Sequence, residues 1–157
     1  MKFIRKTKSL IVTTGPGSYT SLRVGISFIL GLHFSKKIKV AALSAEDLLK
    51  FKIKNNQNLN HGMYIFSGNN QKFICYKLGS LEYKYIKLEE KNIFNYRDLE
   101  KLDIIFYNKV PLKNFEIKFK QKKYQIKKII LENLSSIKFN NLDKLKPIYI
   151  SNNYNLN

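Results

Sequence analysis

In the first third of the chain, short apolar stretches alternate with a segment in which apolar side chains repeat at the spacing of a helix. Short stretches rich in apolar residues at 9–14 and 38–43 predict two short buried strands. Between them, from 18 to 34, apolar side chains recur about every 3.6 residues, which predicts an amphipathic helix. The residues on this apolar stripe are Leu22, Ile26, Ile29, Leu30 and His33. A second helix is predicted after Ser44, so the order of elements indicates a parallel strand pair with a right-handed crossover.

Beyond a polar run at 55–62, interpreted as a linker with His61 in solvent, the pattern changes to alternation. Three stretches alternate apolar and polar side chains between turn residues, which predicts a three-stranded antiparallel meander at 63–67, 72–78 and 82–88. The remaining predicted elements are a short helix at 95–102, strands at 103–108 and 148–151, and a lysine-rich mixture of strand and helix at 115–146. We therefore expect an α/β chain in two parts, residues 1–54 and 62–157.

Small and polar residues mark the ends and one side of the predicted helices. Ser18 and Ser44 stand where a hydroxyl can accept a hydrogen bond from a free amide of the first helical turn. Gly25 and Gly31 lie inside the first helix, where glycine costs about 1 kcal/mol relative to alanine. This cost suggests that another backbone packs closely against the helix.

The chain is strongly basic, with 29 lysines and arginines against 11 acidic residues and a net charge of +18 over 157 residues. Such a charge favours nucleic acid or an anionic surface as a partner. The arginines that usually contact phosphates and bases are few: Arg5, Arg23 and Arg97. We interpret the surplus lysine mainly as compositional drift at solvated positions and keep an RNA-binding module as an alternative. RNA binding would require one face to gather Lys36, Lys37, Lys39, Lys118, Lys120, Lys122, Lys123, Lys127 and Lys128.

Catalytic chemistry has little support in the sequence. The turn at 15–18 stands between strand and helix like a phosphate-binding loop, but no lysine follows its last glycine and Thr20 replaces the third glycine of a dinucleotide fingerprint. A small nucleotide-dependent enzyme is therefore the weakest alternative. The single Cys75 excludes an internal disulfide, and the two histidines have no ligand partners at metal-binding spacing. We expect no metal, no cofactor, no membrane span, and a cytoplasmic location.

The stretch "GPGSYTSLRVG" at 15–25 closely resembles the signature of the TsaB (YeaZ) family, Gly-Pro-Gly-Ser-Phe/Tyr-Thr-Gly-Leu/Val-Arg-Ile/Val-Gly. The likeness continues in "KVAALSAEDLL", and "PIYIS" near the end is similar to the family's Pro-x-Tyr-Leu-Arg. The resemblance covers most of the chain in order. It implies a partial actin-like ATPase, or ribonuclease-H-like, fold without working catalysis.

The function implied by this resemblance is that of a scaffold. The family is the obligate partner of TsaD, which transfers a threonylcarbamoyl group to the tRNA adenosine next to the anticodon. The resemblance implies a TsaD-type partner, indirect contact with tRNA, and an ATPase accessory subunit of the same complex as a further partner. A homodimer through the 18–34 helix is an alternative. The family resemblance implies a partner interface at Ser18, Tyr19, Ser21, Leu22, Gly25, Ile26 and Ile29. It also implies structural roles for Gly15, Pro16, Gly17, Thr20, Arg23, Pro147 and Tyr149.

Three departures separate the chain from the family pattern. Ser21 replaces a glycine in the helix, and "FSGNNQK" stands where the family has Asp-Ala-Arg followed by a glutamate. The chain also starts at what corresponds to the family's fourth strand, so we expect three strands and the first helix to be absent. A non-functional fragment of a split gene is therefore a further alternative.

Overall fold

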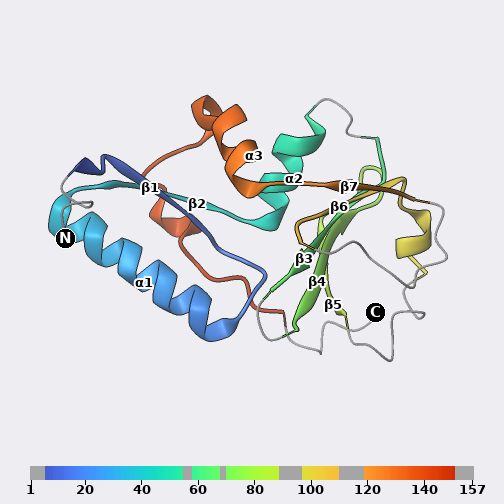
Figure 1. Cartoon of the computed structure of the whole chain (residues 1–157), viewed down its shortest axis with the longest axis horizontal. Helices are drawn as coiled ribbons and strands as arrows, with labels where there is room; N and C mark the ends of the chain where they lie inside the picture. The colour runs from blue at the N-terminus through green and yellow to red at the C-terminus, as the bar shows by residue number, and fades with distance from the viewer. Residues whose placement is uncertain (1–5, 55–57, 68–69, 89–96, 110–118, 151–157) are drawn as a thin grey trace.

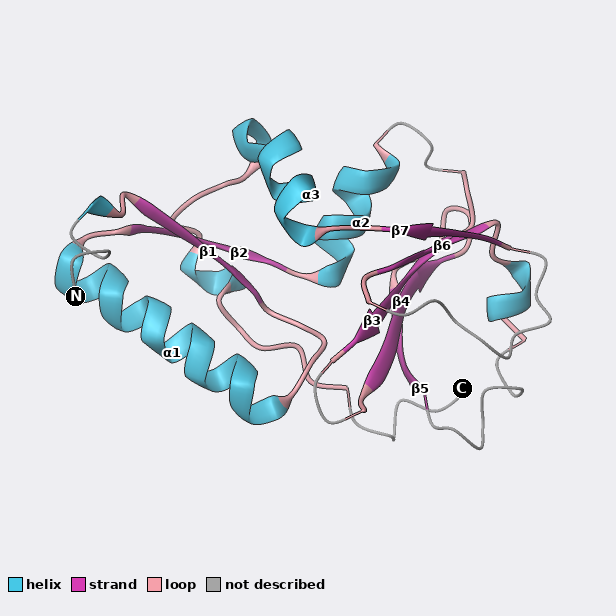
Figure 2. Cartoon of the chain, viewed as in Figure 1, coloured by secondary structure: helices cyan, strands magenta, loops and turns pink. Residues whose placement is uncertain are grey.

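The computed structural model describes residues 6–54, 58–67, 70–88, 97–109 and 119–150, and these form two sheets with helices beside them (Figures 1 and 2). The strands are β1 (Ser9–Thr13), β2 (Lys39–Leu43), β3 (His61–Phe66), β4 (Lys72–Lys77), β5 (Lys84–Leu88), β6 (Ile104–Tyr107) and β7 (Lys120–Lys123). The helices are α1 (Tyr19–Lys36), α2 (Ala45–Ile53) and α3 (Ile126–Glu132), with short 3-10 helices η3 (Leu99–Lys101), η4 (Leu134–Ser136) and η5 (Leu142–Lys144).

The first sheet is the predicted parallel pair of β1 and β2, joined by α1. Ile11 of β1 aligns with Ala41 of β2. One face of this pair is covered by α1, whose Ile26 and Ile29 pack against Val40 in a cluster with Leu10, Val12, Leu30, Ala42 and Leu145. The apolar stripe of the helix and the apolar runs of the strands therefore meet in one core, as their periods predict.

The second sheet contains the predicted meander. β3, β4 and β5 pair antiparallel in sequence order, with Tyr64 opposite Ile74. β6 then joins β3 in parallel, and β7 joins β6 in parallel, giving the order β5-β4-β3-β6-β7. The central strands are mostly buried, whereas all four residues of the edge strand β7 are exposed. Lysines on an edge strand oppose pairing with another chain.

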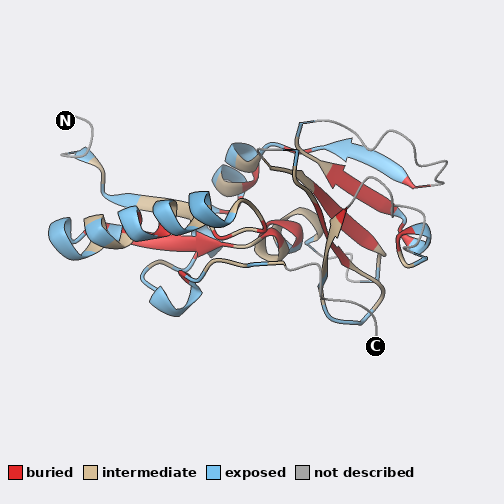
Figure 3. Ribbon diagram, turned by 90° about the horizontal axis from the view of Figure 1, so that it is seen from below, coloured by how far each residue is buried: buried red, intermediate tan, exposed pale blue. Residues whose placement is uncertain are grey.

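The largest core cluster crosses the boundary predicted at 55–62. Leu48 and Leu49 of α2 pack in one cluster with Met63 of β3 and Phe106 of β6. α3 contributes Ile129 to the same cluster. Figure 3 shows the corresponding band of buried residues running through β2, α2 and the second sheet. The two predicted parts therefore share a core.

The C-terminal segment of the described chain packs on the first sheet. The Asn140 side chain accepts a hydrogen bond from the Val40 amide at 3.2 Å, and the Asn140 amide donates to the Val40 carbonyl. Leu145 is 5% exposed in the α1 cluster, and the Ile148 amide donates to the Thr14 carbonyl at 2.8 Å. Residues 140–148 are thus built into the part of the molecule that the sequence assigned to 1–54.

Three local predictions are corrected. His61 is 1% exposed at the start of β3, not in a solvated linker, because the Leu59 carbonyl and the Tyr83 hydroxyl satisfy its ring nitrogens. Within the described part of 95–102, only η3 is helical. Residues 148–150 form no strand, although Ile148 bonds to Thr14. Residues 95–96, 115–118 and 151 lie outside the described residues.

Candidate partner-binding surface

The loop between β1 and α1 is held by backbone hydrogen bonds to three other segments. The Thr14 amide donates to the Leu43 carbonyl at 3.0 Å, and the Ala45 amide donates to the Gly15 carbonyl at 3.1 Å. The Ile148 amide completes the set through the Thr14 carbonyl. These bonds tie the loop to β2, the start of α2 and the C-terminal segment. They indicate a structural loop, in agreement with the absence of a phosphate-binding lysine.

Gly15 is required by this arrangement. Its φ is +114°, and a Cβ atom there would lie 3.0 Å from both the Ile148 carbonyl oxygen and the Leu22 side chain. Any side chain would therefore strain the backbone and push the C-terminal segment away. The peptide bond between Gly15 and the buried Pro16 is cis. Gly17 is less constrained, because its nearest outside neighbour is the Ser67 hydroxyl at 3.6 Å.

Three aromatic and basic side chains stack at the beginning of α1. The rings of Tyr19 and Tyr149 lie 4.5 Å apart, and the Arg23 guanidinium carbon lies 4.4 Å from the centre of the Tyr19 ring. This stack joins the motif at 15–25 to the "PIYIS" segment. Pro147, two residues before Tyr149, is partly buried. The sequence placed these residues in two separate motifs and gave no signal that they touch.

The helix α1 has one face turned inward and one turned to solvent. Ile26 and Ile29 are 5% and 8% exposed, so two residues expected in a partner interface lie in the chain's own core. Leu22 is partly buried beside Gly15. The 3.6-residue period that predicted the helix also explains this: these residues form its apolar stripe, and β1 and β2 cover that stripe.

The solvent face of α1 carries little charge and is partly apolar. Val24 is 63% and Phe28 is 55% exposed, and Tyr19, Thr20, Ser21 and Gly31 are also exposed. The only lysine or arginine residues of α1 are Arg23, which stacks on Tyr19, and Lys36 in its last turn. In a chain with 29 basic residues, this is a long solvent face without lysine. We define the α1 outer face as Tyr19, Thr20, Ser21, Val24, Phe28 and Gly31.

The two glycines of α1 have no neighbour inside the described chain that would require them. A Cβ atom at Gly25 or Gly31 would meet nothing within 4 Å. The close backbone contact that the sequence suggests at these positions is therefore absent among the described residues. Ser18 precedes the helix as predicted, but its hydroxyl makes no capping hydrogen bond.

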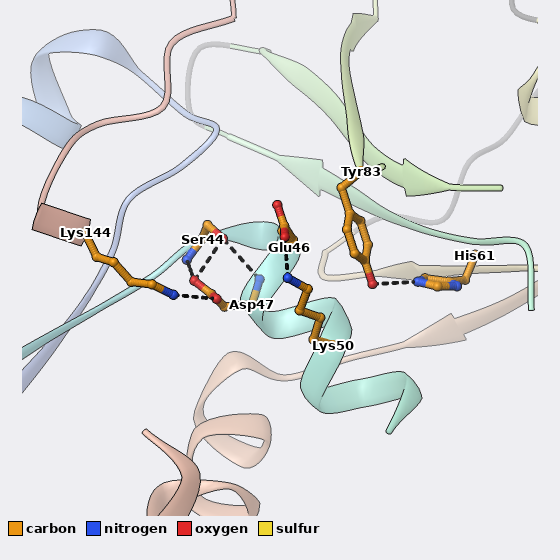
Figure 4. Close-up of polar contacts among 7 residues, drawn as sticks. All are labelled: Ser44, Glu46, Asp47, Lys50, His61, Tyr83 and Lys144. Atoms are coloured by element: carbon orange, nitrogen blue, oxygen red, sulfur yellow. Dashed lines mark hydrogen bonds and ion pairs between the residues drawn. The ribbon is translucent and has the colours of Figure 1, made fainter. Parts of the chain in front are cut away.

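Polar residues gather at the start of α2, as Figure 4 shows. The Ser44 hydroxyl accepts from the Asp47 amide at 3.1 Å, and the Asp47 carboxylate accepts from the Ser44 amide at 2.9 Å. Lys144 donates to the same carboxylate at 3.1 Å. Burial alone would raise the pKa of Asp47, but the hydrogen bonds from Ser44 and Lys144 lower it overall. Each of these groups stabilises the helix start and the attachment of η5.

Two further titratable groups, His61 and Cys75, lie in the interior. Burial lowers the pKa of His61, whose ring contacts Tyr83 at 3.0 Å (Figure 4). Burial raises the pKa of the Cys75 thiol, which is fully buried in β4. Among the described residues, no group of three or more His, Cys, Asp and Glu side chains is arranged to hold a metal ion. None of the described helices is long and apolar enough to cross a membrane.

The lysines that RNA binding would require on one face are divided. One group lies where α1 ends and β2 begins, and the other lies on β7, toward the opposite side of the molecule in Figure 1, and on α3, between the two sheets. The first group is Lys36, Lys37 and Lys39, the second is Lys120, Lys122, Lys123, Lys127 and Lys128, and Lys118 lies outside the described residues. Within the second group, Lys123 and Lys128 line a shallow hollow together with Lys52.

Comparison with known proteins gives a family and a fold. The family model TsaD, described as tRNA N6-adenosine threonylcarbamoyltransferase, matches residues 4–142. A solved Pseudomonas aeruginosa protein, described as uncharacterized with similarity to peptidase YEAZ, has a TM-score of 0.51 at 14% identity over 94% of this chain and 76% of that one. YeaZ from Pseudomonas aeruginosa gives 0.48 at 13% identity, over 92% and 75%. No curated protein matches the sequence.

The match of the family model covers most of the chain, and the order of elements agrees with it. The parallel pair β1-β2 with its helix, the mixed second sheet and the returning C-terminal segment form the α/β architecture of the YeaZ-like structure. The motif at 15–25 forms the connection between β1 and α1 in this architecture. The chain therefore belongs to the tRNA N6-adenosine threonylcarbamoyltransferase (TsaD) family and has the actin-like fold of its YeaZ (TsaB) members.

Proposed function

We propose that this chain is a non-catalytic subunit that binds a TsaD-type threonylcarbamoyltransferase and supports the modification of the tRNA adenosine next to the anticodon. The observation that carries the proposal is the α1 outer face, which exposes Val24 and Phe28 and holds no lysine in a lysine-rich chain. A solvated helix would tolerate lysine there, whereas the desolvated centre of a protein interface disfavours it.

Gly25 and Gly31 support the same surface. Both glycines weaken the helix, and no atom of the described chain lies close enough to require either of them. A helix of a second protein that crosses α1 closely would explain why these two positions are glycine, because small residues allow two helix axes to approach. We propose that the partner packs along the α1 outer face with its closest approach near these glycines.

A non-catalytic role agrees with the loop chemistry. The Thr14 amide donates to the Leu43 carbonyl, and the Thr14 and Gly15 carbonyls accept from the C-terminal segment and from α2, so these groups attach the loop to its neighbours. Ser18 has no base within its hydrogen bonds in the described chain. The proposed chemistry thus belongs to the partner, and tRNA is contacted through it.

Reconstitution tests the proposed role. We expect the purified chain alone to leave tRNA unmodified and not to hydrolyse ATP, and to increase threonylcarbamoyl transfer when it is added to the TsaD-type enzyme of the same source. Transfer by this chain alone, or transfer by the partner at the same rate without it, would contradict the proposal.

Two substitutions test the surface. Phe28→Lys places a charge on the α1 outer face, and Gly25→Leu adds a side chain where the chain itself has space. We expect each to weaken partner binding by about 5- to 150-fold, which corresponds to roughly 1–3 kcal/mol. Leu81→Lys is the matched control, because Leu81 is 58% exposed outside α1. Isothermal titration with the partner should give the Leu81→Lys variant the Kd of the wild-type chain. Equal Kd values for all three variants would show that α1 is not part of the interface.

A further inference from the structure

Lysines from three elements meet at one corner of the molecule, where α2, β7 and α3 approach one another (Figure 1). The hollow there has a volume of about 260 Å³, and its lining includes Lys52, Lys123 and Lys128. The register of the second sheet adds a fourth lysine, because Lys122 pairs with Phe106 on the face that α2 covers. We define the basic corner as Lys52, Lys122, Lys123 and Lys128.

The positive charges of the basic corner are hardly neutralised. Glu132 lies 3.8 Å from Lys128 Nζ, but the two side chains are 47% and 68% exposed, and such a solvated pair contributes little. The other three lysines form no ion pair with any described residue. The Lys52 ammonium lies 5.8 Å from the centre of the Phe106 ring, which brings it from α2 toward Lys122. Several like charges are therefore held together without a counter-charge.

Neither protection of a sheet edge nor compositional drift explains this arrangement. Lysines on an edge strand oppose pairing with another chain, but Lys52 belongs to α2 and Lys128 to α3. Drift would spread lysine over solvated positions, whereas six of the fifteen residues from 117 to 131 are lysine and none is acidic. In the whole chain, 29 of 157 residues are basic and 11 are acidic. The segment that supplies most of the basic corner therefore concentrates positive charge.

We propose that the basic corner binds the phosphate backbone of RNA. Lysine ammonium groups attract phosphates as point charges, and contacts to phosphates carry no sequence information. The described lining of the hollow includes no arginine that could read a base edge, and Tyr124 is 4% exposed, too buried to stack on a base. At about 260 Å³ the hollow is smaller than the pockets of roughly 300–1,000 Å³ that enclose small ligands, so it suits part of a long polyanion.

This inference goes beyond the proposed function and rests on it only for the identity of the natural RNA, a tRNA. The reacting adenosine is still reached through the TsaD-type partner, whereas the basic corner holds backbone phosphates of the same molecule. The corner belongs to α2, β7 and α3 and shares no residue with the α1 outer face. RNA and the partner protein can therefore bind at the same time.

Fluorescence anisotropy with the purified chain tests the proposal, with an unmodified tRNA transcript and an oligouridine as the two probes. We expect both RNAs to bind, and binding to weaken as salt increases, because phosphate contacts release counterions. Removing three charges from the basic corner should weaken binding at least tenfold and lower the slope of log Kd against log salt by about three, one per lysine. This corner variant combines Lys122→Gln, Lys123→Gln and Lys128→Gln.

The matched control removes the same charge elsewhere in the chain. It combines Lys36→Gln, Lys37→Gln and Lys39→Gln, where α1 ends and β2 begins. Because both variants have the same net charge, the control should change the Kd for RNA by less than about threefold. Equal losses in the two variants would overturn the proposal, and so would a wild-type chain that binds no RNA at low salt. Tighter binding to phosphatidylserine vesicles than to RNA would do the same.

Lysine labelling gives a second test that needs no variant. In the wild-type chain, tRNA should protect the basic corner from acetylation while Lys36, Lys37 and Lys39 keep their reactivity, as mass spectrometry can measure for each lysine. Equal protection of both groups would contradict the proposal. The corner variant should bind the TsaD-type partner with the Kd of the wild-type chain, so the partner surface on α1 can fail without affecting this inference. Loss of partner binding with RNA binding retained would make the corner a protein interface and overturn the proposal.

Discussion

At the scale of single residues, His61 couples the stability of the fold to pH. It is 1% exposed, and burial lowers its pKa below the ordinary value of 6.5. As pH falls below about 6.5, the unfolded chain binds a proton that the folded chain does not, so stability should fall by up to about 1.4 kcal/mol per pH unit until the folded pKa is passed. Denaturant titrations of His61→Gln should show a flatter dependence over this window.

The matched control for His61 is Tyr83→Phe. It removes the hydroxyl that contacts the ring but leaves the histidine in the core. Because burial is the main cause of the lowered pKa, this variant should keep the pH dependence of the wild-type chain. Parallel curves for the wild type and His61→Gln would contradict the assignment.

At the scale of elements, α1 and α2 both follow a serine, but only one serine caps its helix. The Ser44 hydroxyl accepts from the Asp47 amide, whereas the Ser18 hydroxyl makes no capping bond. Ser44→Ala should therefore cost about 1 kcal/mol of unfolding free energy, and Ser18→Ala only a few tenths. Urea denaturation measures both. A loss for Ser18→Ala as large as that for Ser44→Ala would show that the difference in geometry has no energetic effect.

At the scale of the whole molecule, the C-terminal segment holds the first sheet in place. Leu145 is buried against α1 and β2, and Asn140 covers the outer edge of β2. Leu145→Ala should cost about 2–5 kcal/mol, because it opens a cavity between these elements. Leu142→Ala removes a side chain that is 36% exposed and should cost much less. Equal unfolding free energies for the two variants would show that the segment does not support the sheet.

The sequence by itself determined the elements whose side chains repeat with a local period. The parallel pair, its crossover helix, the capped start of α2 and the antiparallel meander follow from spacing that neighbouring residues set. The glycine at position 15 also agrees with its place in the sequence, because a tight connection between strand and helix favours glycine. In the structure its φ is positive. The motif at 15–25 and its resemblance gave the family before any contact was known.

Only the tertiary structure decided which of these residues are available to a partner. Ile26 and Ile29 belong to the same helix as Val24 and Phe28, and the sequence could not separate packing inside the chain from packing against another protein. That choice depends on which face β1 and β2 cover. The burial of His61 likewise depends on Tyr83, which lies 22 positions away in the sequence.

The longest-range features were beyond the sequence for the same reason. The parallel addition of β6 and β7 and the bonds from Asn140 to Val40, 100 positions apart, have no local period. Neither has the stack of Tyr19 on Tyr149. A single sequence records what each residue prefers from its neighbours, but burial and hydrogen bonding between distant segments are fixed only when the whole chain packs, because they depend on groups brought together by the fold.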